Sequence, residues 1–572
     1  MNVIGIHDGF VSTAALAMDG RLVGMASEER FTRVKNQGGF PNNTIRWLLD
    51  KFSPPKIDFV SLAGKFPPIA SPDYYRHGRH RIYDALAGGI PSAFQRSHVF
   101  RSIINGCCAR TIRQRIATTA AALGNFGISA PIAAYDHHTC HALAALHTDP
   151  SYTPEERAII ISIDGSGDLL SGGVWETQKH QLRQLAAFSS FDSLGILYSR
   201  TTLLMGMKPH EHEYKIMGLA PYASAALAQR SASVFRSYFT LRDGLFPVNR
   251  SGAWGGRMVK RLHRDLFLHR FDSIAAGLQT VFEELYVNLI ANWRDHTGVS
   301  HVIVTGGCAM NVKANMLLAE RLGGKASVFV MPSGGDESIA LGAAMAGIPS
   351  GDISTRPAMA HLYTGPSYTD EQCFAALNAF PGRLRWDRPE RLEVTAAQML
   401  AEGKIIARCV GNMEWGARAL GNRSILADPS RIDTVTRINR VIKQRDFWMP
   451  FAPSVLSERA SDYFLPLPAL SATPYMTTGF RSTDLARKHL VAALHQADHT
   501  GRPQFVSEHA NPPYYALIKE FERVTGIGAV LNTSFNLHGK PIVNTPTDAL
   551  ETLLNSDLDG LMLGPYIVTR RD

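Results

Sequence analysis

His137 and His141 lie in the stretch whose residue types are best suited to chemistry, DHHTCH at residues 136–141. Residues four apart share one face of a helix, so the two imidazoles could bind one metal ion from the same side. The alanine-rich run at 142–146 favours a helix here, and residues 129–135 predict a short strand that leads into it. Because paired histidines on a helix often bind no metal, further ligands are needed to indicate a site.

Two aspartates could supply those ligands. Asp164 opens the sequence DGSGD after the apolar run 158–163, and Asp336 ends the sequence GGD after the apolar run 328–331. An aspartate beside glycine at the end of a strand is how α/β folds place an acid next to a ligand. Two neutral imidazoles and two carboxylates suit Fe, Mn or Zn better than Ca or Mg. The sequence therefore favours a transition-metal site.

Two glycine turns indicate a nucleotide. The strand predicted at 302–304 runs into TGGCAMN, which contains Gly306, Gly307 and Asn311, and Gly335 lies in a second turn ahead of a small, apolar run. Paired glycines let backbone N–H groups approach phosphates, and the start of a helix adds a favourable dipole. Two such turns in one domain suggest a nucleotide held between two lobes.

Ionisable side chains crowd residues 206–222, GMKPHEHEYKIMGLAPY. A solvated charged loop would explain the charges alone. Because glycine, proline and ionisable groups stand just ahead of an apolar run, a loop that binds a ligand is at least as well supported. We predict substrate contacts for Lys208, Glu211 and Lys215.

Cations gather on loops in the last third of the chain. Residues 411–428, GNMEWGARALGNRSILAD, place Arg418 and Arg423 among glycines after a strand predicted at 404–410. Guanidinium groups bind phosphate through two hydrogen bonds, and glycines let a ligand reach backbone amides. The further candidates are Lys443, Arg445, Arg502, Asn532 and Ser534. Together they predict an anion-binding site with its own chemistry.

The elements that position these residues need more than one domain. At 572 residues the chain is too long for one ordinary domain. Three apolar segments, 3–6, 12–18 and 21–26, predict strands joined around an Asp-Gly turn. This pattern also starts each lobe of the actin–hexokinase-type ATPases. Glycines and prolines break the helical pattern at 347–362 and predict a domain boundary there.

Composition and charge limit the classes of partner. No apolar run is long enough to cross a membrane, and the amino terminus lacks a signal-peptide pattern, so a cytoplasmic enzyme is expected. The net charge of +9 comes mostly from residues 76–115, with eight arginines and one acid. Nucleic-acid binding is one interpretation of this segment. Interleaved apolar residues favour amphipathic helices with a basic outer face, so no nucleic-acid partner is expected.

These motifs together resemble the O-carbamoyltransferase family of nodulation, cephamycin, ansamycin and aminoglycoside carbamoylating enzymes. The resemblance runs nearly end to end, and its most specific parts are residues 137–141, 208–222, 305–311, 414–428 and 531–536. It implies an α/β protein with an actin–hexokinase-type (ASKHA), two-lobed ATPase-like domain at residues 1–355. A YrdC-like α/β domain at residues 356–572 would follow.

The resemblance also implies a reaction in two steps. The second domain would form carbamoyl adenylate and pyrophosphate from carbamoyl phosphate and ATP with Mg(II). The first domain would transfer the carbamoyl group to a hydroxyl of a small natural product beside iron(II), or another divalent metal. A homodimer is expected.

Residue roles follow from the same resemblance. His7 or Asp8 would be the general base that accepts the acceptor's hydroxyl proton. The implied metal ligands are His137, His141, Asp164 and Asp336. The nucleotide would be held by Gly306, Gly307, Asn311 and Gly335. Carbamoyl phosphate and the ATP phosphates would be held by Arg418, Arg423, Lys443, Arg445, Arg502, Asn532 and Ser534, among which Arg418 and Lys443 are the catalytic candidates.

The chain departs from the family pattern at basic positions. Asn412 and Met449 stand where the family commonly has arginine, and Trp415 and Ala417 replace Phe and Pro. Loss of those cations should weaken phosphate binding unless Arg445 or Lys443 compensates.

Two alternative functions stay open at this stage. A threonylcarbamoyl-type tRNA-modifying enzyme would use the basic segment, and it would bind tRNA with strong salt dependence. A non-catalytic nucleotide-binding sensor would release no pyrophosphate from ATP in the presence of carbamoyl phosphate.

Overall fold

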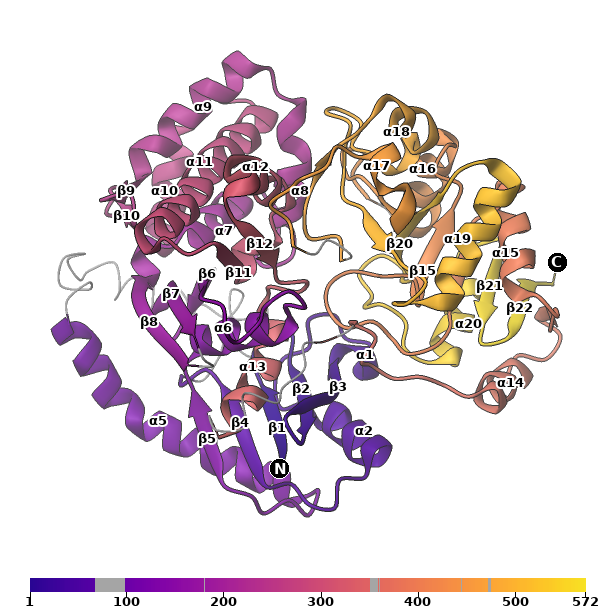
Figure 1. Cartoon of the computed structure of the whole chain (residues 1–572), viewed down its shortest axis with the longest axis horizontal. Coiled ribbons are helices and arrows are strands. Elements are labelled where there is room, and N and C mark those ends of the chain that lie inside the picture. The colour runs from indigo at the N-terminus through magenta and orange to yellow at the C-terminus, as the bar shows by residue number, and fades with distance from the viewer. Residues whose placement is uncertain are drawn as a thin grey trace. The chain divides into compact units, whose positions relative to one another are not determined.

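The computed structural model describes residues 1–66, 98–178, 181–349, 359, 361–443, 445–471 and 475–571. The chain divides into two units (Figure 1). The N-terminal unit comprises residues 1–28, 36–359 and 467–472, and the C-terminal unit comprises residues 29–35, 360–466 and 473–572. The predicted boundary between residues 355 and 356 lies outside the described residues and stays a prediction.

The N-terminal unit contains two five-stranded sheets that repeat one topology. The first has the order β3-β2-β1-β4-β5, with β1 (Asn2–His7), β2 (Thr13–Met18), β3 (Arg21–Ser27), β4 (Phe59–Ala63) and β5 (Ile132–Tyr135). The second has the order β12-β11-β6-β7-β8, with β6 (Ala158–Gly167), β7 (Leu170–Gln178), β8 (Gln181–Ser189), β11 (His301–Thr305) and β12 (Ser327–Val330). In each sheet the first three strands pair antiparallel, and the last two continue in parallel from the first. This duplicated arrangement is the two-lobed actin–hexokinase-type fold expected from the sequence.

The predicted amino-terminal hairpin is confirmed. Strands β1 and β2 pair in register from Asn2 opposite Met18 to His7 opposite Thr13. The turn from β2 to β3 is formed by Asp19 and Gly20, both with positive φ. This backbone conformation matches the twist of the flanking strands, which explains the Asp-Gly pair.

Helices α6 (His137–Thr148) and α13 (Ile339–Ala346) pack against each other, and α13 also packs on β1. A Cβ atom at Gly342 would overlap the Cys140 carbonyl group, and a Cβ atom at Gly5 would overlap the Ala340 carbonyl oxygen. Glycine at both positions therefore lets α13 approach α6 and β1 closely. The contact fixes α6 against the segment that contains Asp336.

The other elements of the N-terminal unit surround the two sheets. They are α2 (Asn42–Phe52), α5 (His98–Gly124), α7 (Leu194–Leu204), α8 (Glu213–Leu219), α9 (Ala225–Tyr238), β9 (Phe239–Arg242), β10 (Phe246–Asn249), α10 (Gly255–Asp265), α11 (Phe271–Thr297) and α12 (Val312–Leu322). Within the described residues, no helix combines the length and apolar character that a membrane span requires.

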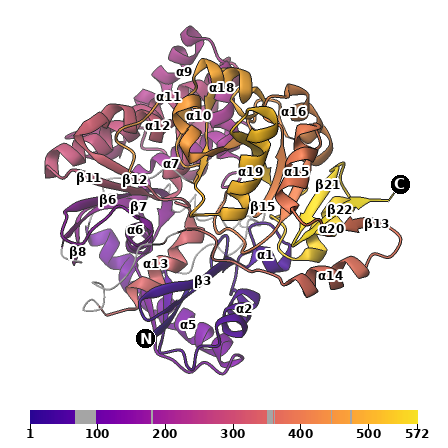
Figure 2. The same ribbon diagram turned by 45° about the vertical axis from the view of Figure 1, so that its right-hand side comes forward.

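The C-terminal unit is built on a mixed eight-stranded sheet in the order β13-β22-β21-β14-β15-β20-β16-β19. Its strands are β13 (Leu384–Asp387), β14 (Ile406–Cys409), β15 (Arg423–Ala427), β16 (Ala452–Leu456), β19 (Gln504–Val506), β20 (Ala529–Ser534), β21 (Gly560–Leu563) and β22 (Tyr566–Arg570). Helices α15 (Leu392–Ala401) and α19 (Pro512–Thr525) lie side by side against the sheet (Figures 1 and 2). The unit thus has the α/β character expected of it.

Shorter elements complete this unit. They are α1 (Glu29–Thr32), α14 (Asp370–Asn378), α16 (Ile432–Ile438), α17 (Ala460–Tyr463), β17 (Phe480–Arg481), α18 (Asp484–His489), β18 (Thr500–Gly501) and α20 (Pro546–Leu554). Ala407 and Cys409 of β14 share a buried core with Leu550 and Leu553 of α20. Because side chains alternate along a strand, this core occupies one face of the sheet.

Candidate metal centre and anion site

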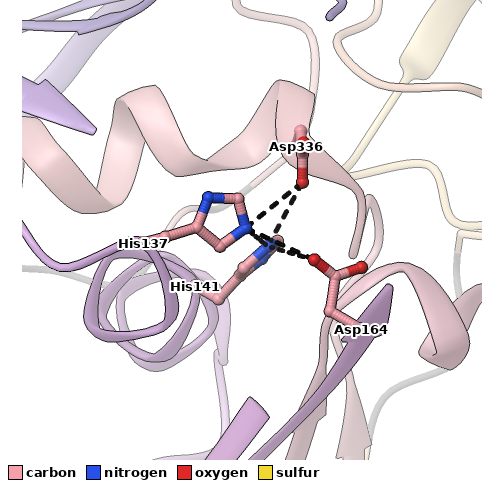
Figure 3. A group of neighbouring side chains, drawn as sticks. All are labelled: His137, His141, Asp164 and Asp336. Atoms are coloured by element: carbon pink, nitrogen blue, oxygen red, sulfur yellow. Dashed lines mark hydrogen bonds and ion pairs between the residues drawn. The ribbon is translucent and has the colours of Figure 1, made fainter. Parts of the chain in front are cut away.

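Four side chains nominated from the sequence converge in the N-terminal unit: His137, His141, Asp164 and Asp336. Each offers one ligand atom, and these atoms lie within 4.8 Å of one another. His137 Nε2 lies 3.3 Å from Asp164 Oδ2 and 3.5 Å from Asp336 Oδ1. Figure 3 shows the two imidazoles of α6 facing the two carboxylates, which come from β6 and from the turn before α13. Both histidines are buried.

The start of α6 fixes the first histidine. The Asp136 carboxylate caps the helix by accepting a hydrogen bond from the Thr139 N–H at 2.9 Å. The Asp168 carboxylate accepts one from the His137 N–H at 2.8 Å and another from the Phe66 N–H at 2.8 Å. These bonds satisfy N–H groups at the helix start and hold His137 in place.

Asp164 lies within a strand and not at its end, where the sequence pattern placed it. Strand β6 continues through it to Gly167, and its pairing with β7 is irregular after Ile163. The turn comes at Asp168 and Leu169, which have φ of 50° and 65°. An irregular strand re-aims its side chains, which explains how the Asp164 carboxylate reaches α6.

Two further hydrogen bonds fix Asp164 on the side away from the histidines. Its Oδ1 accepts a hydrogen bond from the Gly307 N–H at 3.0 Å, and its carbonyl oxygen accepts one from the Ser193 hydroxyl at 2.9 Å. Oδ2 remains directed at the histidines. Gly307, predicted to contact a nucleotide, therefore orients a candidate metal ligand in this structure.

The electrostatics of the cluster favour a cation. Burial alone would lower the pKa of both imidazoles, but Asp336 and Asp164 outweigh it and raise the pKa of His137 and of His141. Burial would raise the pKa of the carboxyl groups, but the two imidazoles lower the pKa of Asp164 and of Asp336. A buried carboxylate, Asp164, and a half-buried one, Asp336, therefore need compensating positive charge, from protons or from a metal. Two imidazole nitrogens and two carboxylate oxygens are a donor set that fits a transition metal.

Gly167 offers a direct test of metal binding. A Cβ atom at Gly167 would overlap the His137 ring, whereas one at Gly165, in the same strand, would meet none of the described residues within 4 Å. We expect Gly167→Ala to weaken the binding of Fe(II), or of Co(II) as a probe, by about 10- to 100-fold, and Gly165→Ala to leave it unchanged. Titration calorimetry on the full chain measures both, and equal affinities for the two variants would exclude His137 as a ligand.

His7 lies at the end of β1 with one ring nitrogen free. Its Nε2 is 3.0 Å from the Phe10 carbonyl oxygen, which can only accept a hydrogen bond, so Nε2 carries the proton. Its Nδ1 is buried and has no hydrogen-bond partner among the described residues. Burial lowers the pKa of His7, against the opposing effects of Asp336 and Asp8. The geometry thus presents a neutral imidazole with an open acceptor nitrogen.

Asp8 is instead paired with Arg115 of α5. The guanidinium Nε lies 3.2 Å from Asp8 Oδ2, and Nη2 contacts Asp8 Oδ1 and donates to the Ala63 carbonyl oxygen at 3.0 Å. This arginine is buried and also contacts the Gly64 carbonyl oxygen. Asp8 and Arg115 are 107 residues apart, and no sequence signal distinguished Arg115 from the other arginines of the basic segment. Residues 76–97 of that segment lie outside the described residues.

The predicted substrate loop is partly helical. Lys208 forms an ion pair with Glu211, and Lys215 lies on α8. The His210 ring is 5.8 Å from the Phe10 ring, which places this loop beside the turn after His7. Contacts of these residues with a substrate stay predictions.

The two glycine turns lie next to each other. A Cβ atom at Gly334 would come within 2.8 Å of the Gly306 carbonyl oxygen, and one at Gly335 would overlap the Glu337 carboxylate. Asn311 caps α12 and exchanges two 3.0 Å hydrogen bonds with the Gln279 amide. Nucleotide contacts of Gly306, Gly307, Asn311 and Gly335 stay predictions, with the Asn311 amide already engaged within the protein.

Three arginines cluster in the C-terminal unit. Burial lowers the pKa of Arg502 well below its ordinary value, and the neighbouring charges of Arg418 and Arg445 lower it further. The Arg445 guanidinium lies 5.8 Å from the centre of the Phe451 ring. A group of half-buried guanidiniums that repel one another is stabilised by a bound anion, so this cluster suits phosphate.

Arg423 is held differently from these three. It is buried, and its guanidinium donates to the carbonyl oxygens of Val410, Gly411, Asn422, Asn544 and Pro366 at 3.1 to 3.4 Å. Because five backbone carbonyl oxygens accept hydrogen bonds from its guanidinium, Arg423 joins these segments to one another. Its contact with phosphate stays a prediction, and its guanidinium nitrogens already donate to these carbonyl oxygens.

The remaining candidates of this unit are polar groups along β20 and a lysine. The Asn532 amide donates to the Ser454 hydroxyl at 2.9 Å, and the Ser534 hydroxyl donates to Asn536 at 2.7 Å. The Lys443 side chain lies outside the described residues, so its predicted catalytic role stays a prediction. Met449 is buried, Asn412 is exposed, and neither side chain carries a charge.

Comparisons with known proteins match both units. The family description "Carbamoyltransferase N-terminus" matches residues 2–345, and "Carbamoyltransferase C-terminus" matches residues 397–570. Nodulation protein NolNO of Sinorhizobium fredii is 30% identical over 577 residues, which cover 99% of this chain and 79% of that protein. The 3'-hydroxymethylcephem-O-carbamoyltransferase of Amycolatopsis lactamdurans is 29% identical over 374 residues, 63% of this chain and 65% of that protein. Among solved structures, HypF of T. kodakarensis has a TM-score of 0.32 at 11% identity, covering 62% of this chain and 49% of that chain.

Proposed function

The chain belongs to the carbamoyltransferase family, and we propose that it is an ATP-dependent O-carbamoyltransferase that acts on a hydroxyl group of a small secondary metabolite. It is a transferase. The observation that supports the finer proposal is the four-residue cluster of the N-terminal unit, because it would hold a metal in one unit while the arginine cluster belongs to the other unit. Two separate sites suit a reaction in two steps.

In the proposed first step, the C-terminal unit forms carbamoyl adenylate from carbamoyl phosphate and ATP. Water displaces phosphate from carbamoyl phosphate and leaves carbamate. A carbamate oxygen then bonds to the α-phosphorus of ATP, and pyrophosphate leaves. Both substrates are polyanions, and ATP would bring Mg(II). Arg418, Arg445 and Arg502 would bind and orient their phosphates, since guanidiniums match phosphate oxygens in geometry and charge.

In the proposed second step, the acceptor's hydroxyl oxygen attacks the carbamoyl carbon and AMP leaves. His137, His141, Asp164 and Asp336 would hold the metal, for which we propose Fe(II). When bound, such a metal supplies Lewis-acid polarisation and charge neutralisation. The Asp164 carboxylate is kept in orientation by the Gly307 N–H.

We assign the general base to His7 rather than to Asp8. The Asp8 carboxylate is occupied by Arg115, whereas His7 Nδ1 has an open lone pair that can accept the hydroxyl proton. The proton would come to rest on Nδ1 while Nε2 keeps its bond to the Phe10 carbonyl oxygen. Asp8 and Arg115 would hold the neighbouring backbone.

The pH dependence of transfer should report this base. Burial lowers the His7 pKa below the usual histidine pKa of about 6.5. The imidazole therefore stays neutral at pH 6.5 and becomes protonated only at lower pH. We expect the single-turnover transfer rate at saturating metal to be level down to about pH 6.5 and to fall at lower pH. His7→Gln should reduce the rate by about 10²- to 10⁴-fold and remove this acid limb. His263→Gln, which changes an exposed histidine of the same unit, should match wild type.

The experiment that tests the whole function is product analysis. The protein is incubated anaerobically with ATP, Mg(II), carbamoyl phosphate, Fe(II) and a panel of hydroxylated natural products, and mass spectrometry follows carbamoylated acceptor and AMP. Equal amounts of the two products support the proposal. Formation of ADP without carbamoylated product would contradict it. A homodimer is part of the proposal, and size-exclusion chromatography with light scattering tests it.

A further inference from the structure

Residues 29–35 come from the amino-terminal part of the sequence but fold with the C-terminal unit. The family description for the amino-terminal part spans residues 2–345 and therefore includes them. Glu28, just before the segment, accepts hydrogen bonds from Thr44 in the N-terminal unit. Figure 2 shows α1 of this segment, in indigo, near α20 of the C-terminal unit. The C-terminal unit is thus completed by an early part of the chain.

Arg33 anchors the segment to the stretch before α20. Its guanidinium donates to the carbonyl oxygens of Ile542 and Pro541, the latter at 3.1 Å. Its Nε lies 3.3 Å from the Asp548 carboxylate, and both side chains are largely buried. Asp548 in turn caps α20 through the Thr545 N–H at 2.9 Å. The anchor therefore combines charge with hydrogen bonds to fixed backbone groups.

Arg30 reaches the loop that carries Arg418. It is 7% exposed, and its Nη2 donates to the Gly416 carbonyl oxygen at 3.1 Å. Its Nε lies 3.5 Å from the Glu29 carboxylate. Its Nη1 is buried and has no hydrogen-bond partner among the described residues. A buried guanidinium nitrogen without a partner is costly, so this donor is suited to an anionic oxygen.

The same loop is held from within by Glu414. Its Oε1 accepts hydrogen bonds from the N–H groups of Leu420, Asn422 and Arg423 at 2.6, 3.2 and 3.1 Å. Gly416 lies between these residues in the loop, and its carbonyl oxygen accepts the hydrogen bond from Arg30. The position of Arg418 therefore depends on Glu414 on one side and on Arg30 on the other.

We infer that Arg30 is a positioning residue of the carbamoyl-adenylate site, supplied by the amino-terminal part of the sequence and acting through the Gly416 carbonyl on the loop that carries Arg418. This inference rests on the proposed function for the chemistry of that site. It adds a residue that neither the C-terminal match, residues 397–570, nor the sequence motifs include. Arg33 fixes the segment so that Arg30 keeps this contact.

Three full-length variants test the inference. Arg30→Gln removes the charge, Arg30→Lys keeps a charged donor for the Gly416 carbonyl, and Arg21→Gln changes an exposed arginine of the N-terminal unit as the control. Two readouts are used: pyrophosphate release with ATP and carbamoyl phosphate, and hydrogen exchange of peptides covering residues 410–424 without substrates. Co(II) affinity reports whether the N-terminal unit remains folded.

We expect Arg30→Gln to raise the KM for carbamoyl phosphate by about 10-fold or more, with a smaller change in kcat. In Arg30→Gln, hydrogen exchange in residues 410–424 should be faster and Co(II) affinity should be unchanged. Arg30→Lys should have a KM closer to that of wild type. An unchanged exchange rate and an unchanged KM in Arg30→Gln would overturn the inference. Equal losses of pyrophosphate release in Arg30→Gln and Arg30→Lys, together with lost Co(II) affinity, would also overturn it. If wild type releases no pyrophosphate, the proposed function fails, while the exchange comparison still decides the positioning role.

Discussion

His141→Ala should abolish carbamoyl transfer to the acceptor and leave pyrophosphate formation largely intact. The imidazole is fully buried, and its Nε2 lies 3.5 Å from Asp336 Oδ1 and 3.7 Å from Asp164 Oδ2. Its removal takes away one of the four candidate metal ligands and leaves the buried Asp164 and the half-buried Asp336 with one imidazole partner fewer. Since a bound metal contributes several kcal/mol of transition-state stabilisation, we expect transfer to fall by about 10²- to 10³-fold or more.

The measurement follows carbamoylated acceptor and pyrophosphate in one reaction. Pyrophosphate is the internal control, because His141 lies in the N-terminal unit and adenylation is assigned to the other unit. The variant should also bind Fe(II) more weakly in calorimetry. Loss of pyrophosphate together with transfer, in a variant that is otherwise folded, would contradict the two-site scheme.

Arg418→Ala has the second large effect that we expect, since it should slow both steps strongly. Adenylation slows because one guanidinium is lost from the cluster with Arg445 and Arg502, and transfer slows because less carbamoyl adenylate is supplied. A hydrogen-bonded ion pair with phosphate stabilises by about 1.5 to 3 kcal/mol, which corresponds to a loss of about 10- to 100-fold in kcat/KM for pyrophosphate release.

Arg431→Ala is the matched control for this variant. Arg431 belongs to the same unit, is exposed and pairs with Asp433, so its removal should leave both activities at the level of wild type. Metal affinity should be normal in Arg418→Ala, because the candidate metal ligands lie in the N-terminal unit. Normal pyrophosphate release in Arg418→Ala would remove this arginine from the adenylation site.

The metal cluster shows what local sequence patterns can predict. The spacing of His137 and His141 predicted a helix with both imidazoles on one face, and apolar runs predicted the strands that bring in Asp164 and Asp336. The structure brings all four together. The pattern at the amino terminus likewise predicted the hairpin of β1 and β2, because hairpin turns and buried strands leave strong local signals. The actin–hexokinase-type fold was implied by the family resemblance.

What the sequence did not predict depends on contacts between distant residues. Arg115 pairs with Asp8 across 107 positions, and Arg30 bonds to Gly416 across 386. Neither arginine differs in its local pattern from arginines on the surface. Arg423 is a further case. Its motif predicted phosphate binding, and its guanidinium donates to backbone carbonyl oxygens of distant segments. Asp164 lies within β6 rather than at its end, because the strand continues past Ile163 with an irregular pairing that depends on the neighbouring β7.

The measurement that tests the central claim most directly is pyrophosphate release by the purified protein supplied anaerobically with ATP, Mg(II), Fe(II) and carbamoyl phosphate. The two-step account predicts pyrophosphate that requires carbamoyl phosphate and appears without any acceptor, because adenylation precedes transfer. ADP and phosphate in place of pyrophosphate, or pyrophosphate that forms equally without carbamoyl phosphate, would contradict the account.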